Sequence, residues 1–243
     1  MSGHSKWKNI QAKKGKTDAQ RAKIFTKLSR EIIVAVKEGG ANPDANAKLR
    51  DVIAKAKAAN VPNDNLNRVI TKAAGSADQS NYEYITYEGY GPRGIAVIVD
   101  AMTDNRNRTA SDVRHYFDKY GGNLGTTGCV SWMFDKKGVI VLDSEGLDEE
   151  TVMLDAIECG ASEFEASEEV FEIYTEPDSF GEIRESLEKL GYNFVSAQIE
   201  MVAQNYVTLT DEDDIKNMNK LIEMLEDNDD VQNIYHSWEE DTN

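Results

Sequence analysis

The two ends of this 243-residue chain carry opposite charge, and this split constrains the fold more than any single motif. Residues 1–75 contain sixteen Lys and Arg residues against six Asp and Glu residues, a net charge of +10, whereas the whole chain carries −17. Residues 76–243 therefore carry −27. Such asymmetry indicates a polyanion-binding module attached to an acidic, solubilising remainder. Because the Debye length is roughly 8 Å at physiological salt, a distant acidic domain would not cancel the field of the basic one.

Within the basic part, helical periodicity begins only after residue 16. Residues 1–16 show neither a helical nor a strand period and predict an extended basic arm with one aromatic residue, Trp7. Apolar residues then recur at helical spacing in three segments, which predicts a three-helix unit over residues 17–75. A Thr17–Gln20 capping box would begin the first helix, and Gly39 and Gly40 would end it. Asn63 is the expected N-cap of the third helix.

The chain changes character after a small, polar stretch over residues 75–81. Strands are expected over residues 82–88, 95–102 and 130–134, with a helix over 108–120 that Thr109 and Asp112 would cap. Residues 138–202 predict the order βαββαβ, which is the ferredoxin-like plan. A strand over 206–210, a helix over 211–226 and a strand over 231–237 follow.

The pieces on either side of the ferredoxin-like unit are each incomplete, which predicts that this unit is inserted into a second α+β domain. The expected fold class is therefore α+β: an N-terminal three-helix domain followed by two α+β domains, one of them ferredoxin-like. The expected domains are residues 1–78, residues 79–136 with 204–243, and residues 137–203. A serial arrangement of the same elements is the alternative.

Sequence motifs for catalysis and for nucleotide binding fail on inspection. Gly89-x-Gly91-x-x-Gly94 matches a dinucleotide-binding loop, but a strand follows it where the mechanism needs a helix, so it predicts a hairpin turn. His4, His115 and His236 lie in different segments, and Cys129 and Cys159 are far apart and predict reduced thiols. We expect no enzymatic activity, no cofactor and no metal site. An enzyme that acts on nucleic acid is a minor alternative.

Location and assembly are constrained by what the printed sequence lacks. No apolar run approaches the roughly 18 residues of a membrane span, and no apolar segment of a secretory signal follows the basic arm. We expect a cytoplasmic protein with no membrane partner, and a monomer rather than an oligomer.

The basic arm and the helices after it are the strongest candidates for binding DNA or RNA. Phosphate contacts by Lys and Arg release counterions, so binding of this kind weakens steeply with salt. Trp7 would either stack on a base or anchor the arm. A second cluster lies between a strand and a helix, where free backbone N–H groups favour anions. The candidate nucleic-acid contacts are Lys6, Trp7, Lys8, Lys13, Lys14, Lys16, Arg21, Lys23, Lys27, Arg30, Lys48, Arg50, Lys55, Lys57, Asn105, Arg106 and Arg108.

Long stretches of the sequence resemble the YebC/PmpR family. The resemblance spans the whole chain and is clearest before residue 135. It is carried by Gly3-His4-Ser5-Lys6-Trp7, Asn9-Ile10-Gln11, Phe25-Thr26-Lys27, Arg30-Glu31-Ile32, Asn60-x-Pro62, Tyr87-Glu88-Gly89-Tyr90-Gly91-Pro92, Thr103-Asp104-Asn105-Arg106-Asn107-Arg108-Thr109, Gly121-Gly122-x-Leu124-Gly125 and Trp132-x-Phe134.

The resemblance implies a three-domain cytoplasmic regulator of gene expression. Members of that family are described as probable transcriptional regulators that bind DNA, and mitochondrial relatives are translational activators. A ribosome-associated factor that binds ribosomal or transfer RNA and relieves stalled elongation is the alternative. Chain physics favours RNA, because the sequence predicts no helix-turn-helix with a dimer interface and an arm with an isolated Trp suits structured RNA.

Overall fold

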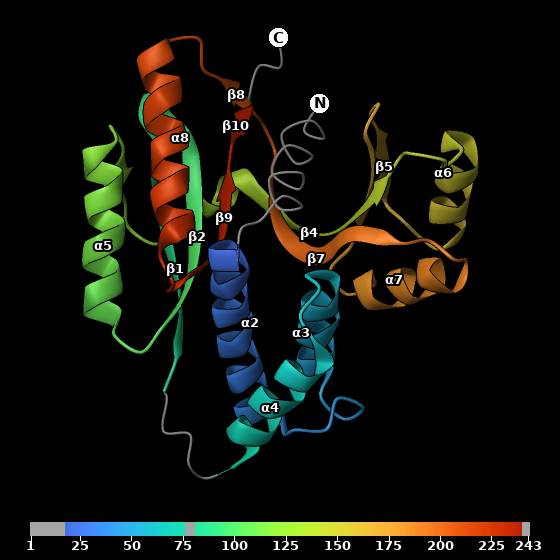
Figure 1. Ribbon diagram of the computed structural model, residues 1–243. Helices are drawn as coiled ribbons and strands as arrows, with labels where there is room; N and C mark the ends of the chain where they lie inside the picture. Colours follow the sequence, from blue (N-terminus) through green and yellow to red (C-terminus); the bar gives the residue numbers. More distant parts are fainter. Residues whose placement is uncertain (1–17, 76–80, 240–243) are drawn as a thin grey trace. The chain divides into compact units, whose positions relative to one another are not determined.

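A computed structural model describes residues 18–75 and 81–239 (Figure 1). The N-terminal domain consists of helices α2 (Asp18–Gly39), α3 (Ala47–Ala58) and α4 (Asn63–Ala74). Their apolar faces meet in one core that includes Ile32, Leu49, Ala56 and Leu66. The three expected helices are confirmed; the predicted capping box begins at Thr17, outside the described residues.

A single buried amide connects α2 to α3. The side chain of Asn46 accepts a hydrogen bond from the N–H of Leu49 at 3.1 Å and donates to the carbonyls of Ala35 and Gly40 at 2.8 Å each. It therefore caps α3 and closes the end of α2 at once. The expected cap of α4 was wrong: Pro62 occupies the N-cap in an extended conformation, and Asn63 is already helical.

The second domain is built on a four-stranded antiparallel sheet. Its strands β1 (Glu83–Tyr90), β2 (Ala96–Thr103), β3 (Asn123–Leu124) and β9 (Val231–His236) lie in the order β3-β1-β2-β9. The short 3-10 turn η1 (Pro92–Gly94) joins β1 to β2, with Arg93 and Gly94 at positive φ, so the hairpin turn expected at the glycine motif is confirmed.

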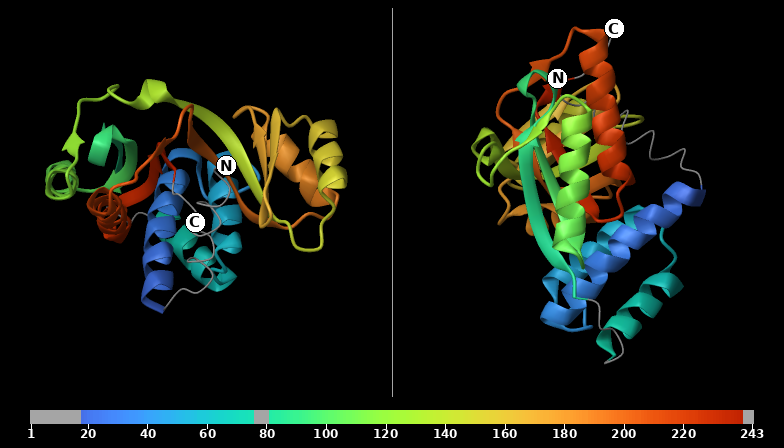
Figure 2. Two further views of the ribbon diagram at one scale, coloured as in Figure 1. Left: turned by 90° about the horizontal axis from the view of Figure 1, so that it is seen from above. Right: turned by 90° about the vertical axis from the view of Figure 1, so that its left-hand side faces the viewer.

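Two helices pack side by side against this sheet, α5 (Arg106–Lys119) and α8 (Glu212–Asp227), as Figures 1 and 2 show. Val97 and Val99 of β2 pack with Phe117 of α5 and with Met218 and Leu221 of α8 in the core between them. Strand β9, which follows the ferredoxin-like unit in sequence, pairs with the second edge of β2 and completes the sheet.

Two strand predictions were wrong in detail. Residues 131–133 form a 3-10 turn, η2 (Ser131–Met133), and β4 (Phe134–Asp143) begins after it. The N–H groups of Gly128, Val130 and Ser131 donate to the Glu88 carboxylate, so they are not available for strand pairing. The strand expected over 206–210 is reduced to β8 (Val207–Thr208), which pairs with β10 (Trp238–Glu239) outside the main sheet.

Residues 134–202 form a compact unit of their own, separate from the chain up to residue 133 and from 203 to 238. The order is β4, α6 (Glu149–Glu158), β5 (Glu163–Ala166), β6 (Val170–Thr175), α7 (Phe180–Lys189) and β7 (Phe194–Ala203), and the strands lie in the order β5-β6-β4-β7. This is the ferredoxin-like plan. The predicted α+β class, with a helical domain and two α+β domains, is confirmed.

Candidate nucleic-acid interface

The candidate contacts separate into three groups once they are placed on the structure. Lys6, Trp7, Lys8, Lys13, Lys14 and Lys16 lie outside the described residues. A second group on α2 and α5 contacts carboxylates and carbonyls of the α+β domain. The third group, Lys48, Arg50, Lys55 and Lys57, lies on α3.

Three cations of α2 contact the end of α8 and its connection to β9, residues 226–230, which we call the acidic corner. Lys23, Lys27 and Arg30 follow one another at helical spacing and therefore share a face of α2. Lys23 Nζ lies 2.7 Å from Asp227 Oδ1, and Lys27 Nζ donates to the Glu226 carbonyl at 2.9 Å. Burial lowers the pKa of Lys27 to about 8, although Glu226 and Asp229 act in the opposite direction. These three cations therefore already contact groups within the protein and are less available to bind a polyanion.

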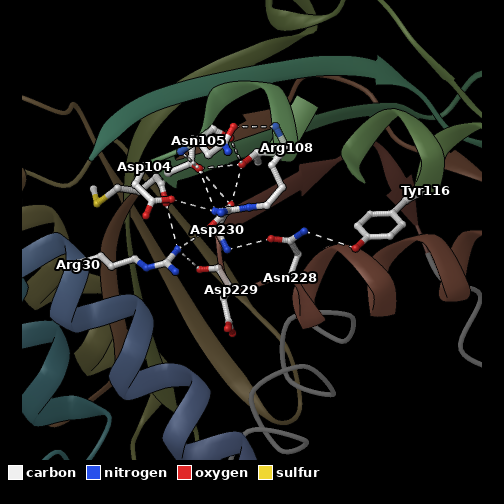
Figure 3. Close-up of polar contacts among 11 residues, drawn as sticks. Arg30, Asp104, Asn105, Arg108, Tyr116, Asn228, Asp229 and Asp230 are labelled. Carbon is white, nitrogen blue, oxygen red and sulfur yellow. Dashed lines mark hydrogen bonds and ion pairs between the residues drawn. The ribbon is translucent and has the colours of Figure 1, made fainter. Parts of the chain in front are cut away.

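Asp230 lies at the centre of the acidic corner and collects donors from three segments (Figure 3). Its Oδ1 accepts from Arg30 Nη1 at 2.6 Å, and its Oδ2 accepts from Arg108 Nη2 at 2.7 Å. The hydroxyls of Thr109 and Thr103 also donate to Oδ2, at 2.7 and 3.1 Å. Arg30 Nη1 further donates to the Asp229 carbonyl at 2.7 Å. The carboxylate is buried, and each of its oxygens has a charged donor.

These donors reverse the usual effect of burial on this carboxyl group. Burial alone would raise the pKa of Asp230, but the hydrogen bonds from Arg108, Thr109, Arg30 and Thr103 lower it to about 2. Asp230 is therefore ionised at all physiological pH values. A buried ion pair of this kind is costly to break from one side, since the remaining charge is left without a partner.

The motif of residues 104–109 combines structural residues with one exposed cation. Asn105 caps α5 by accepting from the Arg108 N–H at 3.1 Å, so the expected cap at Thr109 was wrong. Thr109 is fully buried, and its hydroxyl contacts Thr103 and Asp230. Arg108 binds Asp104 at 3.0 Å as well as Asp230. Arg106 is 68% exposed, and its nearest carboxylate, that of Glu83, lies 4.0 Å away. Arg106 is thus better placed than Arg108 to meet an external phosphate.

On α3, paired and unpaired cations alternate. Lys48 pairs with Glu38 at 2.7 Å, and Lys55 pairs with Glu31 at 2.9 Å. Arg50 and Lys57 are exposed, and no ion pair or side-chain hydrogen bond between described residues engages them. The same is true of two cations on α4 that the sequence-based site omitted, Arg68 and Lys72. Their spacing opposite the buried Leu66 and Ala73 was the available signal. Arg21 is exposed as well but has a partner within the chain.

An open cavity of about 350 Å³ lies beside the Asp230 network. Its lining includes Arg30 and Arg108, but four aspartates line it as well: Asp112, Asp227, Asp229 and Asp230. Carboxylates thus outnumber guanidinium groups, and both guanidinium groups already bind Asp230. The cavity therefore does not favour a phosphate.

A second buried carboxylate escaped the sequence reasoning. Glu88 accepts from the N–H groups of Gly128, Val130 and Ser131 at 2.7, 2.9 and 2.8 Å. Burial would raise its pKa, but these three backbone hydrogen bonds together lower it. Nothing in its sequence pattern separates it from a surface Glu, because its partners lie forty residues further along the chain.

Residues 18–75 and 81–239 contain neither a cluster of metal ligands nor a membrane-spanning helix. No group of three or more His, Cys, Asp or Glu side chains in this part of the chain is arranged to hold a metal ion. No helix found there is long and apolar enough to cross a membrane.

Two family models match almost the whole chain. The model described as the TACO1/YebC protein N-terminal domain matches residues 5–76, and the model described as the TACO1/YebC second and third domain matches residues 82–238. The chain is 62% identical to a "probable transcriptional regulatory protein" of Acetivibrio thermocellus over 98% of its own length and 99% of that protein. It is 60% identical to a protein of the same description from Caldicellulosiruptor saccharolyticus, over 99% and 100% of the two chains.

A solved structure shares the fold. The crystal structure of a conserved hypothetical protein from Aquifex aeolicus matches with a TM-score of 0.85 and 47% identity, and the match covers 94% of each chain. The helical domain and both α+β domains are therefore features that this chain shares with a relative whose structure has been solved.

Proposed function

Because the chain belongs to the TACO1/YebC family, we propose that it is a regulator of gene expression that binds nucleic acid through α3, α4 and the basic arm. The observation that carries the proposal is the distribution of charge. Lys23, Lys27 and Arg30 are engaged by the acidic corner, whereas Arg50, Lys57, Arg68 and Lys72 are exposed to solvent. These four cations, in a chain of net charge −17, provide a basic surface that the rest of the protein does not neutralise.

Regulation of transcription is the first candidate, since the curated relatives carry that description. One feature of the N-terminal domain supports contact with duplex DNA. Residues 59–62 join α3 to α4, and Asn60 in this connection has a positive φ of 59°. Short turns of this kind join the two helices of helix-turn-helix motifs. Asn67, Arg68, Thr71 and Lys72 are all exposed on the second helix, and their side chains are of the types that contact bases and phosphates.

A translation factor that binds ribosomal or transfer RNA is the second candidate. Support for RNA comes from Trp132, a large aromatic side chain exposed on an ordered loop. Unpaired bases of RNA stack on exposed aromatic side chains, whereas duplex grooves offer no such face. The ribosome is the expected assembly if this candidate is correct.

We propose binding rather than catalysis as the mode of action. Among the described residues, the two buried carboxylates whose pKa is lowered by their surroundings, Asp230 and Glu88, are both engaged by donors within the protein. Neither is placed to exchange a proton with a substrate.

The test is a charge-reversal variant in which Arg50, Lys57, Arg68 and Lys72 are all replaced by Glu. The matched control reverses four exposed lysines elsewhere, Lys119, Lys136, Lys189 and Lys216, and so changes net charge equally. We expect the first variant to lose most of its affinity for DNA and RNA, and the slope of log affinity against log salt to fall by about 3 to 4. The control should retain both. Equal losses in the two variants would show that binding follows net charge and would overturn the proposed surface.

A further inference from the structure

Trp132 is the most exposed large hydrophobic side chain among the described residues, at 68%. The contrast with Trp238, which is buried in the core of the α+β domain, shows that the domain can bury an indole. Leaving an indole in water forgoes one of the largest favourable transfer energies of any side chain. An indole left in water on an ordered loop is therefore a candidate binding group, because exposed aromatic side chains stack on bases in single-stranded nucleic-acid sites.

The segment that carries this side chain, residues 121–133, is here called the Trp132 loop, and it is held in one conformation. The Glu88 carboxylate accepts hydrogen bonds from three N–H groups of this loop. Tyr90 Oη and Trp132 Nε1 each donate to the Cys129 carbonyl at 3.0 Å. The indole is thus anchored at its Nε1 edge while most of the side chain remains exposed.

Two glycines of the loop are required by close packing. A side chain at Gly122 would meet the Tyr90 carbonyl oxygen at 2.6 Å, and one at Gly125 would collide with Cys129 Sγ. Such contacts are tighter than real Cβ atoms adopt, so the backbone path depends on glycine at both positions. A loop this constrained presents its exposed side chain at little further cost in conformational entropy on binding.

Apart from the indole, the exposed residues of the Trp132 loop are glycines or polar: Gly121, Asn123, Gly125, Thr126, Thr127 and Gly128. An aromatic anchor of a protein–protein interface normally lies within an apolar, water-excluding patch. A nucleobase needs only a flat aromatic face and hydrogen-bonding groups at its edge, which the threonine hydroxyls can provide. The composition of the loop therefore favours a base over an apolar protein surface.

We propose that the Trp132 loop is a stacking platform for an unpaired nucleobase, with the base on the indole of Trp132. The proposal rests on the proposed function, because it assigns the base contact of a protein whose phosphate contacts lie on α3 and α4. It also gives the chain a means of distinguishing unpaired from paired nucleic acid.

The test compares Trp132→Ala, Trp132→Phe and the wild-type full chain by fluorescence anisotropy. The probes are three labelled ligands of equal length: single-stranded RNA, single-stranded DNA and duplex RNA. Stacking of one base on an aromatic side chain contributes about 1–3 kcal/mol, so we expect Trp132→Ala to weaken single-strand binding about 5- to 150-fold. Trp132→Phe, which keeps an aromatic face, should lose less. Duplex affinity should not change in either variant.

Each outcome bears on the proposal in a different way. Wild-type binding that Trp132→Ala leaves unchanged would overturn the stacking platform, keep the proposed function and leave the indole to a protein partner. An equal loss for single strands and duplex would also overturn it. No binding of any ligand by the wild type would overturn both proposals. The comparison of single-stranded RNA with single-stranded DNA shows which nucleic acid supplies the base. Because Trp132 is exposed, both variants should unfold at the wild-type temperature.

Discussion

Arg30 and Asp230 are 200 residues apart in sequence, and their side chains form an ion pair of 2.6 Å that is largely buried. The first lies on a helix of the basic N-terminal domain, and the second lies immediately before β9 of an acidic one. The pair explains why part of the positive charge of the N-terminal domain does not serve nucleic acid. Its cations divide into those that the chain itself uses and those that it leaves exposed.

Replacing Asp230 by Ala is expected to destabilise the protein by about 3–5 kcal/mol. The change leaves Arg30, Arg108, Thr103 and Thr109 without their shared acceptor, and unpaired buried charge is the main cost. Urea denaturation measures the effect. The matched control is Asp229→Ala, because the neighbouring residue is exposed and contributes its carbonyl to Arg30. Equal effects at the two positions would show that the network does not carry the stability.

Acid should destabilise the wild type through the same carboxylate. Asp230 has a folded pKa of about 2 against an ordinary value of 3.8, so its stabilisation is complete above pH 4. It is lost as the pH falls through about 2. The contribution is roughly 2 kcal/mol, since one pKa unit corresponds to 1.36 kcal/mol. Denaturation measured from pH 5 to pH 2 in the wild type and in Asp230→Asn separates this term, because the variant should show a shallower decline.

Arg106→Ala and Arg108→Ala should have opposite profiles. Arg106 is 68% exposed, so its loss is expected to change stability by less than about 0.5 kcal/mol while weakening nucleic-acid binding. Arg108 binds two carboxylates with a side chain that is 48% exposed, so its loss should cost about 1 kcal/mol of stability. Melting temperature and affinity measured on both variants test this, and a loss of stability at Arg106 equal to the loss of binding would make that residue structural.

Charge reversal at Lys13, Lys14 and Lys16 of the basic arm should weaken binding to DNA and RNA and leave the unfolding temperature unchanged. Each phosphate contact that is removed lowers the slope of log affinity against log salt by about 0.9 for a duplex. A salt titration measures it. Affinity and slope that both match the wild type would remove the arm from the proposed interface.

Glu88→Ala should loosen the Trp132 loop more than it disturbs the rest of the sheet. The N–H groups of Gly128, Val130 and Ser131 would lose their common acceptor, and unsatisfied buried groups cost about 1–3 kcal/mol each. Hydrogen exchange should then become faster at these amides than at those of β2. Uniform acceleration across the domain would indicate general destabilisation. Glu83→Ala, on the exposed end of the same strand, is the control.

The secondary structure was largely predictable because hydrophobic periodicity depends on local spacing. The buried faces of α2, α3 and α4 and the all-buried strand β2 leave that signal in the sequence. Predictions failed where a distant side chain takes over local hydrogen bonding. Glu88 takes three amides from the segment expected to be a strand, and Asp230 takes the Thr109 hydroxyl that was expected to cap α5.

The candidate site shows the same limit. Sequence could count the cations of residues 1–75, but it could not separate Lys23 and Arg30, which the acidic corner engages, from Arg50 and Lys57, which are exposed. That distinction depends on the position of residues 226–230 in the folded protein, which spacing along the sequence does not give. Helical spacing alone would have been enough to include Arg68 and Lys72 in the predicted site.

The position of β9 at the end of the chain has a consequence for synthesis. A nascent chain completes α2 and β2 long before it reaches residue 231, and the ferredoxin-like unit must be translated in between. Domains form as units from the N-terminus during synthesis, so the ferredoxin-like unit can fold while its host is still missing a strand. Throughout that interval one edge of β2 has no neighbour, and Lys23, Lys27 and Arg30 have no acidic corner. The emerging protein is therefore more basic at α2 than the finished one, and residues 226–230, which are translated much later, neutralise that charge.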